Sequence, residues 1–262
     1  MSQKGFFTDT SICIGCKACE VACKQWNQLP EDGLSFSGMS YDNTLQLGAS
    51  TWRHVAFIER PVALSNQMAG GFSWLFSSDV CKHCQRAGCL ESCPTGAIIR
   101  TRHDTVYVQP DVCNGCGYCV VGCPFGVIDR RPDDGRAWKC TFCYDRLEAG
   151  MIPACAKACP TESIQFGELE ELQARARERV EGLQASGVKE AYLYGADKRS
   201  QPGTEGLNAF FLLLDRPEAY NLPPDPCIPQ KKVKESWLAL AAGAVVMAAA
   251  AFLAVVPGGG SR

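Results

Sequence analysis

The sequence predicts an α+β fold that consists of two nested cysteine-rich modules, an insertion hairpin and one C-terminal transmembrane helix. Three observations support this prediction. Seventeen of the 262 residues are cysteine, and 16 of these lie in four groups of four between Cys13 and Cys159. Short alternating apolar patterns, typical of strands, flank and separate these groups. Residues 237–256 contain no charged side chain and are numerous enough for a membrane-spanning helix.

Composition and charge exclude several classes of protein. An apolar fraction of 46% excludes a disordered chain, and a net charge of -2 lacks the basic excess of a nucleic-acid binder. The first ten residues, MSQKGFFTDT, contain no apolar run long enough for a signal peptide, so we expect no export signal in this chain. Small disulfide-stapled secreted folds are also rarely this long. The grouped cysteines are therefore expected to bind metal.

The spacing of the cysteine groups favours iron–sulfur clusters over zinc. Groups one and three follow C-x2-C-x2-C-x3-C, the bacterial ferredoxin run for a [4Fe-4S] cluster, and groups two and four have a longer middle gap. Structural zinc sites pair two C-x2-C knuckles and do not need a third cysteine so close by. We therefore expect four [4Fe-4S] clusters; a zinc-binding structural adaptor is the alternative from a different class.

The groups are expected to work in pairs, because the fourth cysteine of a ferredoxin run binds the other cluster of its pair. Only 19 residues separate Cys93 from Cys113, and they read as two short strands around a polar turn at residues 102–104, so groups two and three pair. The 57 residues between groups one and two are too many for this hairpin, which leaves group one for group four. The result is two nested ferredoxin-like modules, the inserted one spanning about residues 79–130.

This pairing assigns the grouped cysteines to four ligand sets, which we number by cluster. Set 1 is Cys13, Cys16, Cys19 and Cys159; set 2 is Cys81, Cys84, Cys89 and Cys123; set 3 is Cys113, Cys116, Cys119 and Cys93; set 4 is Cys140, Cys143, Cys155 and Cys23. Cys227, in a proline-rich linker, is not expected to be a ligand.

The remaining elements complete one domain, residues 1–230. The strand-like stretch GFFTD before group one is expected to meet SIQFG after group four. Residues 24–80 contain the strand-like stretch WRHVAFIER, which suggests an insertion hairpin on the domain surface, and another hairpin turns at residues 132–135. Residues 168–185 place apolar side chains at helical spacing, and residues 209–214 read as a short apolar strand.

Residues 231–262 are expected to form a membrane anchor with a helix at 237–256. These 20 uncharged residues give a helix of about 30 Å, the thickness of a bilayer core. The alternative is a buried helix in a soluble bundle, but the position behind a proline-rich linker favours the membrane. None of the three histidines lies in this helix, so the chain alone cannot hold a bis-histidine haem in the bilayer.

No catalytic residues are expected in this chain. It has no glycine-rich nucleotide fingerprint after a strand, and no Ser/His/Asp or Cys/His arrangement apart from the cluster ligands. A chain with four redox centres and no substrate site is expected to carry electrons between partner proteins.

Four longer motifs surround the cysteine groups: GFFTDTSICIGCKACEVACKQWN, CKHCQRAGCLESCPTGAI, CNGCGYCVVGCPFGVIDR and KCTFCYDRLEAGMIPACAKACPT. Together with the C-terminal anchor they resemble the iron–sulfur beta subunit of membrane-bound respiratory formate dehydrogenases. The cysteine groups are also shared with beta subunits of dimethyl sulfoxide reductase and nitrate reductase, so they indicate the role better than the substrate. Cys116 is present where nitrate reductase beta subunits have tryptophan, and the dimethyl sulfoxide reductase type lacks a single C-terminal membrane helix.

The resemblance implies partners and a direction of electron flow. A catalytic alpha subunit with a molybdenum or tungsten bis-pterin and its own cluster would oxidise formate, and a cytochrome b gamma subunit would reduce quinone. Electrons would arrive at the clusters of sets 1 and 4 and leave through those of sets 2 and 3. The electron-transfer subunit of a [NiFe] hydrogenase, or of another molybdopterin oxidoreductase, is the alternative interpretation.

Two arguments about the membrane side conflict. Lys231, Lys232 and Lys234 precede the helix and Arg262 alone follows it, which by the positive-inside rule places the cluster domain in the cytoplasm. The resemblance implies the outer face of the cell membrane, reached with a catalytic partner that bears a twin-arginine signal. We expect the outer face.

Overall fold

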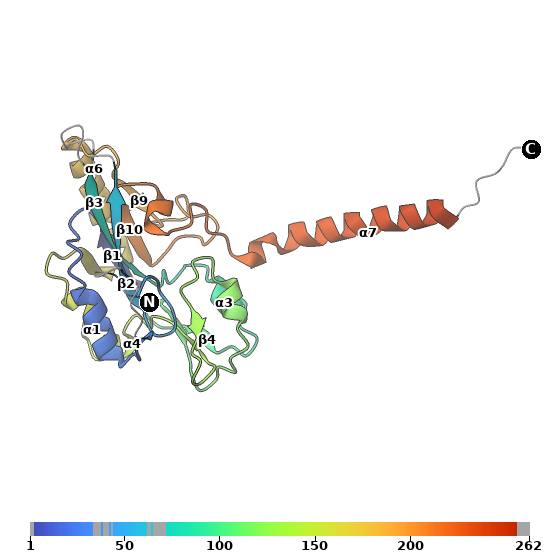
Figure 1. The fold of residues 1–262 in the computed structure, drawn as a ribbon, viewed down its shortest axis with the longest axis horizontal. Coiled ribbons are helices and arrows are strands. Elements are labelled where there is room, and N and C mark those ends of the chain that lie inside the picture. The colour runs from blue at the N-terminus through green and yellow to red at the C-terminus, as the bar shows by residue number, and fades with distance from the viewer. Residues whose placement is uncertain are drawn as a thin grey trace, which may run out of the picture.

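The computed structural model describes residues 3–33, 38, 42, 44–61, 64 and 72–255, and Figure 1 shows their arrangement. In chain order the elements are β1 (Lys4–Asp9), α1 (Ala18–Asn27), β2 (Arg53–Arg60), β3 (Ser73–Val80), α2 (Gly88–Glu91), β4 (Ile98–Arg100), β5 (Val106–Val108), α3 (Tyr118–Gly122), β6 (Asp129–Arg130), β7 (Ala137–Trp138), α4 (Tyr144–Glu148), α5 (Ala154–Lys157), β8 (Ile164–Glu168), α6 (Leu169–Ala185), β9 (Tyr192–Tyr194), β10 (Ala209–Leu213), the 3-10 turns η1 (Pro217–Tyr220) and η2 (Pro229–Lys232), and α7 (Val233–Val255). Helices and strands are mixed along the chain, as an α+β fold requires.

A four-stranded sheet joins the two ends of the cysteine-rich region. Its strand order is β8-β1-β10-β9. β1 is antiparallel to β8, with Phe6 opposite Phe166, which confirms that the strands before group one and after group four meet. β1 is parallel to β10, with Phe7 opposite Phe210. The chain therefore returns after group four to pair with its first strand, β1. Groups two and three lie between β1 and β8 in the sequence.

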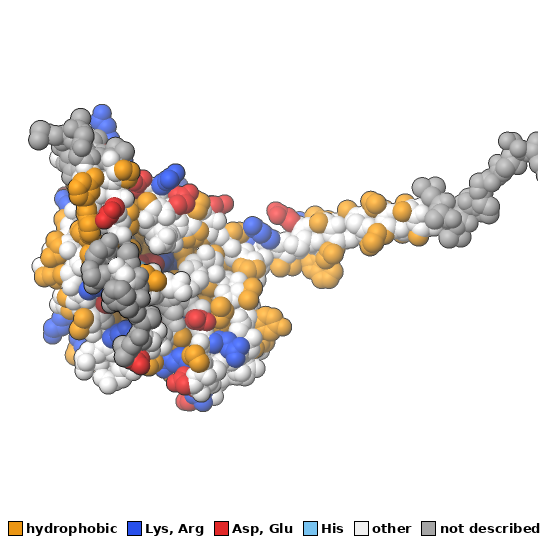
Figure 2. All heavy atoms as spheres, viewed as in Figure 1, with side chains coloured by type: hydrophobic (Ala, Val, Ile, Leu, Met, Phe, Trp, Pro, Cys, Tyr) orange, Lys and Arg blue, Asp and Glu red, His pale blue; other side chains and the backbone are white. Residues whose placement is uncertain are grey.

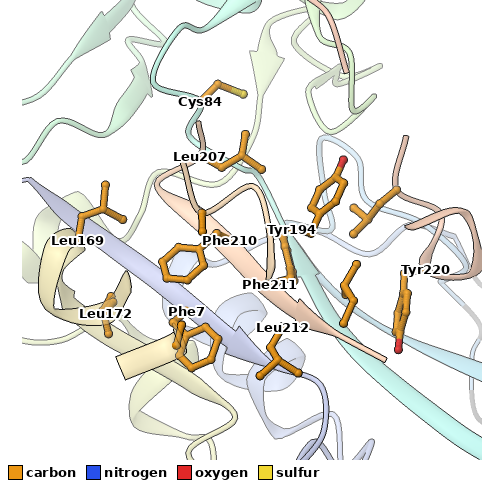
Figure 3. Close-up of a cluster of buried hydrophobic side chains, with 14 of the residues drawn as sticks. Phe7, Cys84, Leu169, Leu172, Tyr194, Leu207, Phe210, Phe211, Leu212 and Tyr220 are labelled. Atoms are coloured by element: carbon orange, nitrogen blue, oxygen red, sulfur yellow. The ribbon is translucent and has the colours of Figure 1, made fainter. Parts of the chain in front are cut away.

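β1 contributes to two buried apolar clusters because its side chains alternate in direction. Phe7 stacks on Phe210 with ring centres 5.3 Å apart, and this cluster includes Leu169 and Leu172 from α6 (Figure 3). Phe6 belongs to the other cluster, which contains cysteines of sets 1, 2 and 4. Both clusters contain cysteines, so β1 packs against cysteine loops on each side, and α6 adds to the cluster of Phe7.

The predicted helix at 168–185 forms as α6, and its apolar stripe faces the sheet. Leu169, Leu172 and Ala176 are buried, while Val180 and Leu183 pack at the edge of the same apolar cluster. The predicted strand at 209–214 forms as β10, and every residue of β10 is buried. Both predictions are confirmed.

Three two-stranded hairpins complete the cluster domain. β4 and β5 form the hairpin expected between groups two and three, and β6 and β7 form the one expected around residues 132–135. The insertion hairpin consists of β2 and β3, with Arg53 opposite Val80. The expectation that this hairpin lies on the surface is wrong for its inner end, because residues 53–56 are all buried.

The C-terminal helix α7 projects away from the cluster domain, and its apolar side chains face outward along its length (Figures 1 and 2). Residues Pro229–Phe252 are long and apolar enough to cross a membrane, and no residue of their apolar stretch is buried inside the protein. α7 begins at Val233, four residues before the predicted start, because Lys234 and Glu235 are compatible with a helix. Hydropathy locates a span but not the helix end.

Candidate iron-sulfur sites

The four cysteine groups share one local backbone conformation. In each C-x-x-C loop the residue before the second cysteine has a positive φ: 66° at Gly15, 43° at His83, 72° at Gly115 and 64° at Phe142. The third cysteine of each group then occupies the second position of a short helix, α1, α2, α3 or α5. A left-handed residue followed by a helical turn brings the cysteines of one loop around a common centre.

Three cavities are each lined by four cysteines from two different groups. One is lined by Cys13, Cys16, Cys19 and Cys159, a second by Cys81, Cys84, Cys89 and Cys123, and a third by Cys93, Cys113, Cys116 and Cys119. These cavities bring together the cysteines of sets 1, 2 and 3.

The donors around these cavities suit a cluster better than a single ion. Zinc holds thiolate sulfurs at about 2.3 Å, so a zinc site needs its ligands close together. In the described part of the chain, no three His, Cys, Asp or Glu side chains are close enough together to hold one ion. The donor set, four cysteines around an enclosed space, is the one that a [4Fe-4S] cluster uses.

The cysteines of set 4 are all buried and lie close to one another. Burial raises the pKa of Cys23 well above its ordinary value, and the nearby Cys140, Cys155 and Cys143 raise it further. The side-chain amide of Asn27 lies 3.7 Å from the sulfur of Cys23. The backbone N–H of Phe142 donates to the sulfur of Cys140 at 3.3 Å.

Burial keeps four of the unligated thiols neutral at pH 7. It raises the pKa of Cys19 and of Cys89 to about 12, and that of Cys119 and of Cys143 to about 11. Metal sites use the thiolate form. Cluster binding at these sites must therefore release protons.

Hydrogen bonds reach several ligand sulfurs, and such bonds adjust cluster potentials. The backbone N–H of Ala137 donates to Cys113 at 3.4 Å. The sequence Cys-Pro-Thr occurs twice, and each threonine hydroxyl lies near its cysteine sulfur, at 3.6 Å for residues 93–95 and 3.8 Å for residues 159–161. Sets 1 and 3 thus have the same threonine contact, in each case at the one cysteine that comes from the paired group.

The four sets lie in a linear order that the sequence does not show. After burial itself, Cys155 of set 4 is among the groups that raise the pKa of Cys19 in set 1. Cys81 of set 2 acts in the same way on Cys140 of set 4, and Cys119 of set 3 acts on Cys89 of set 2. These neighbours give the order 1, 4, 2, 3.

Exposure follows the same order. Cys16 in set 1 and Cys116 in set 3 are exposed, whereas every cysteine of set 4 and all of set 2 except the half-buried Cys123 are buried. The two end sets therefore reach the surface and the two inner sets do not. Cys227 lies apart in the linker, where its thiol is 3.6 Å from the carbonyl oxygen of Ile228.

Two of the buried cations near the sets, Arg53 and Lys139, were not identified from the sequence as site residues. Arg53 is 1% exposed and lies 3.3 Å from the sulfur of Cys155. Lys139 is 2% exposed and donates to the carbonyl oxygens of Val106 and Cys140. Lys139 could have been noticed because it precedes a ligand, but Arg53 stands in the insertion, remote from every cysteine motif.

His83 lines the set 2 cavity between two cysteines. Its Nδ1 accepts the backbone N–H of Val106 at 3.0 Å, so the proton of the neutral ring is on Nε2. Burial and the charge of Lys139 hold the pKa of His83 well below its ordinary value. Nε2 is buried and has no hydrogen-bond partner in the protein. Buried donors nearly always have an acceptor, and a cluster in this cavity would supply one.

Comparison with known proteins identifies the family. Two regions, residues 12–97 and 72–169, match family models of a 4Fe-4S dicluster domain. The chain is 40% identical over 259 residues to the formate dehydrogenase iron-sulfur subunit of Haemophilus influenzae, covering 95% of this chain and 80% of the relative. It is 40% identical over 240 residues to the formate dehydrogenase-O iron-sulfur subunit of Escherichia coli, covering 89% and 76%.

A more distant relative matches a shorter part of the chain. One subunit of the anaerobic dimethyl sulfoxide reductase of Escherichia coli is 33% identical over 174 residues, covering 66% of this chain and 78% of the relative. The resemblance inferred from the four motifs is thus confirmed. This chain belongs to the family of formate dehydrogenase iron-sulfur subunits, and it is an electron-transfer subunit that carries four [4Fe-4S] clusters.

Proposed function

We propose that this chain carries electrons from the catalytic subunit of a formate dehydrogenase to a cytochrome b subunit that reduces quinone in the membrane. Formate gives up two electrons and one proton and becomes CO2, and the quinone takes up two electrons and two protons. Each [4Fe-4S] cluster accepts and releases one electron at a time. The observation that supports this function best is the linear order of four sets with exposed cysteines only at its ends.

The ligand sets of this proposal are those that the spacing predicts. Sets 1, 2 and 3 are supported by the three cavities that their cysteines line. Set 4 is supported by the mutual influence of its four buried cysteines. In each set the three cysteines of one loop are completed by the fourth cysteine of the paired group, the arrangement of two-cluster ferredoxins.

The position of the anchor supports a direction of flow. Ile228, just before η2, is completely buried, and a Cβ added to Gly88 would lie 3.0 Å from its side chain. Gln230 donates to the hydroxyl of Ser92 at 2.7 Å. The root of α7 is thus fixed to α2, which carries Cys89. We infer that sets 2 and 3 form the end near the membrane and that sets 1 and 4 receive electrons from the catalytic subunit.

The proposal divides the chain into a cluster domain at residues 1–230 and a membrane anchor at 231–262, with the inserted module at about 79–130. α7 would cross the bilayer with its exposed apolar surface against lipid. We place the cluster domain on the outer face. Protease treatment of right-side-out vesicles should then digest the cluster domain, and protection of residues 1–230 would contradict this face.

A variant in the middle of the relay tests the function. Cys84→Ala removes a buried ligand of set 2 and should abolish formate-to-quinone electron transfer in membranes that contain the complex. Formate oxidation with a soluble dye that takes electrons at the catalytic subunit should persist, since that reaction bypasses this chain. Cys227→Ala is the matched control and should leave both activities and the iron content unchanged.

The same assay distinguishes a formate dehydrogenase from a hydrogenase as the catalytic partner. A complex that reduces the dye with hydrogen and not with formate would overturn the formate assignment and indicate a hydrogenase partner. Loss of dye reduction in Cys84→Ala, with the complex still assembled, would show that this chain acts in formate oxidation itself and not as a relay.

A further inference from the structure

We propose that Arg53 is the shared counter-charge of clusters 1 and 4 and raises the reduction potential of both. The inference rests on the ligand sets of the proposed function. It concerns a side chain in the insertion hairpin, outside every cysteine motif. Three observations support it: the isolation of the charge, its contacts with both sets, and an N–H group without a partner.

The charge of Arg53 is deeply buried without a carboxylate. The residue begins β2 and is 1% exposed, and within the described part of the chain it makes no ion pair. Arg60, at the other end of the same strand, pairs instead with Asp215 at 2.8 Å. A buried cation with no anion is strongly destabilising, so the fold requires a negative partner near Arg53.

The groups that surround Arg53 are cluster cysteines. Burial alone would lower the pKa of Arg53, but the nearby Cys155, Cys19, Cys140 and Cys23 raise it above its ordinary value. These cysteines belong to sets 1 and 4. The negative partner is therefore supplied by the thiolates, and by the clusters that they hold.

Hydrogen bonds connect the guanidinium to both sets. Its Nη2 lies 3.3 Å from the sulfur of Cys155 in set 4. Its Nη1 donates to the hydroxyl oxygen of Ser78 at 3.2 Å, and that oxygen lies 3.2 Å from the sulfur of Cys19 in set 1. Arg53 thus contacts set 4 directly and set 1 through one side chain.

A third N–H of Arg53 has no partner in the protein. Nε is buried and makes no hydrogen bond, while the ring of Phe6 lies 5.1 Å from the guanidinium carbon. Buried N–H groups are nearly always satisfied. A sulfide of an adjacent cluster is an acceptor of the kind that is missing here.

The electrostatic consequence has a definite sign. A [4Fe-4S] cluster with four thiolates is anionic, and reduction adds one more negative charge. A fixed cation stabilises the reduced form more than the oxidised form, and the low dielectric of a buried site strengthens this effect. The guanidinium keeps its proton at every working pH, so one electron arrives and no proton is exchanged at Arg53.

Redox titration of the purified complex, followed by electron paramagnetic resonance, tests the proposal through Arg53→Gln. Two of the four cluster potentials should fall, each by at least a tenfold change in the reduction equilibrium, which is about 59 mV for one electron. The other two potentials should stay in place. Arg60→Gln, on the same strand, should move none.

Arg53→Lys covers the case in which the glutamine variant fails to assemble. It keeps the charge and should retain four clusters, with smaller shifts at the same two potentials. Four unmoved potentials in Arg53→Gln, equal shifts of all four, or loss of clusters in Arg53→Lys would each overturn the role of Arg53. Fewer than four clusters in the unaltered protein would instead overturn the ligand sets.

Discussion

The C-x-x-C loops of sets 1 and 3, at the ends of the relay, and those of sets 2 and 4, in its middle, have the same backbone conformation. These end loops and inner loops differ in the residue at the left-handed position. At the ends, the left-handed residue is glycine, Gly15 or Gly115, and the next cysteine is exposed. In the inner loops it is His83 or Phe142, and the next cysteine is buried. A left-handed residue other than glycine costs roughly 1–2 kcal/mol, so at this position the inner loops accept strain that the end loops avoid.

The inner side chains offset this strain by packing against each other. The rings of His83 and Phe142 meet edge to face with centres 4.6 Å apart, and Phe142 also lies 4.2 Å from Phe6. They fill the space between sets 2 and 4, where the two nested modules meet. One loop conformation therefore serves two purposes: access for partners at the ends and exclusion of water in the middle.

The largest effect is expected from Phe142→Ala, which would remove the inner packing. Phe142 is fully buried between β1 and His83, so its truncation should destabilise the chain by about 3–5 kcal/mol. Urea unfolding of the purified complex, followed by circular dichroism and iron content, measures this loss. An unchanged unfolding midpoint would mean that the two modules do not depend on this contact.

Gly115→Ala should show why the ends need glycine. An added Cβ would lie 2.4 Å from the backbone oxygen of Gly135, in addition to the strain of a φ of 72°. Clash and strain together should cost about 2–4 kcal/mol in urea unfolding. A smaller loss than in Gly150→Ala, a control for backbone strain alone, would contradict this steric account.

Lys139→Met should distinguish the clusters of the inner sets, 2 and 4, from those of the end sets, 1 and 3, by their reduction potentials. Lys139 influences Cys81 and Cys89 of set 2 and Cys140 of set 4. Its removal should lower two cluster potentials, each by about tenfold in the reduction equilibrium, or about 1.4 kcal/mol. One of these signals should also move in Arg53→Gln, because set 4 contacts both cations. Two disjoint pairs of signals would contradict the ligand sets.

The smallest effect is expected from Gly150→Ala, the control for strain alone. Gly150 has a φ of 70°, and an added Cβ would meet nothing within 4 Å. The loss in urea unfolding should therefore be only about 1 kcal/mol. A loss as large as that of Gly115→Ala would show that the strain of a positive φ accounts for both losses, and that the contact with Gly135 adds nothing.

Local patterns in the sequence were enough for most of the fold. The cysteine spacing, the two short hairpins and the apolar stripe of α6 each depend on neighbouring residues, and the structure confirms these elements. The parallel pairing of β1 with β10 could not be predicted, because strand partners distant in sequence leave no local pattern. The same limit applies to Arg53 and Ser78, which only the β2–β3 hairpin brings to the cysteines.

The fixed root of α7 affects how often the relay meets its acceptor. Ile228 and Gln230 hold the start of the helix against α2, so little free chain separates the clusters from the anchor. If a bilayer holds α7, as proposed, the search for a membrane acceptor is confined to the plane of the bilayer, which raises the effective concentration of the two partners.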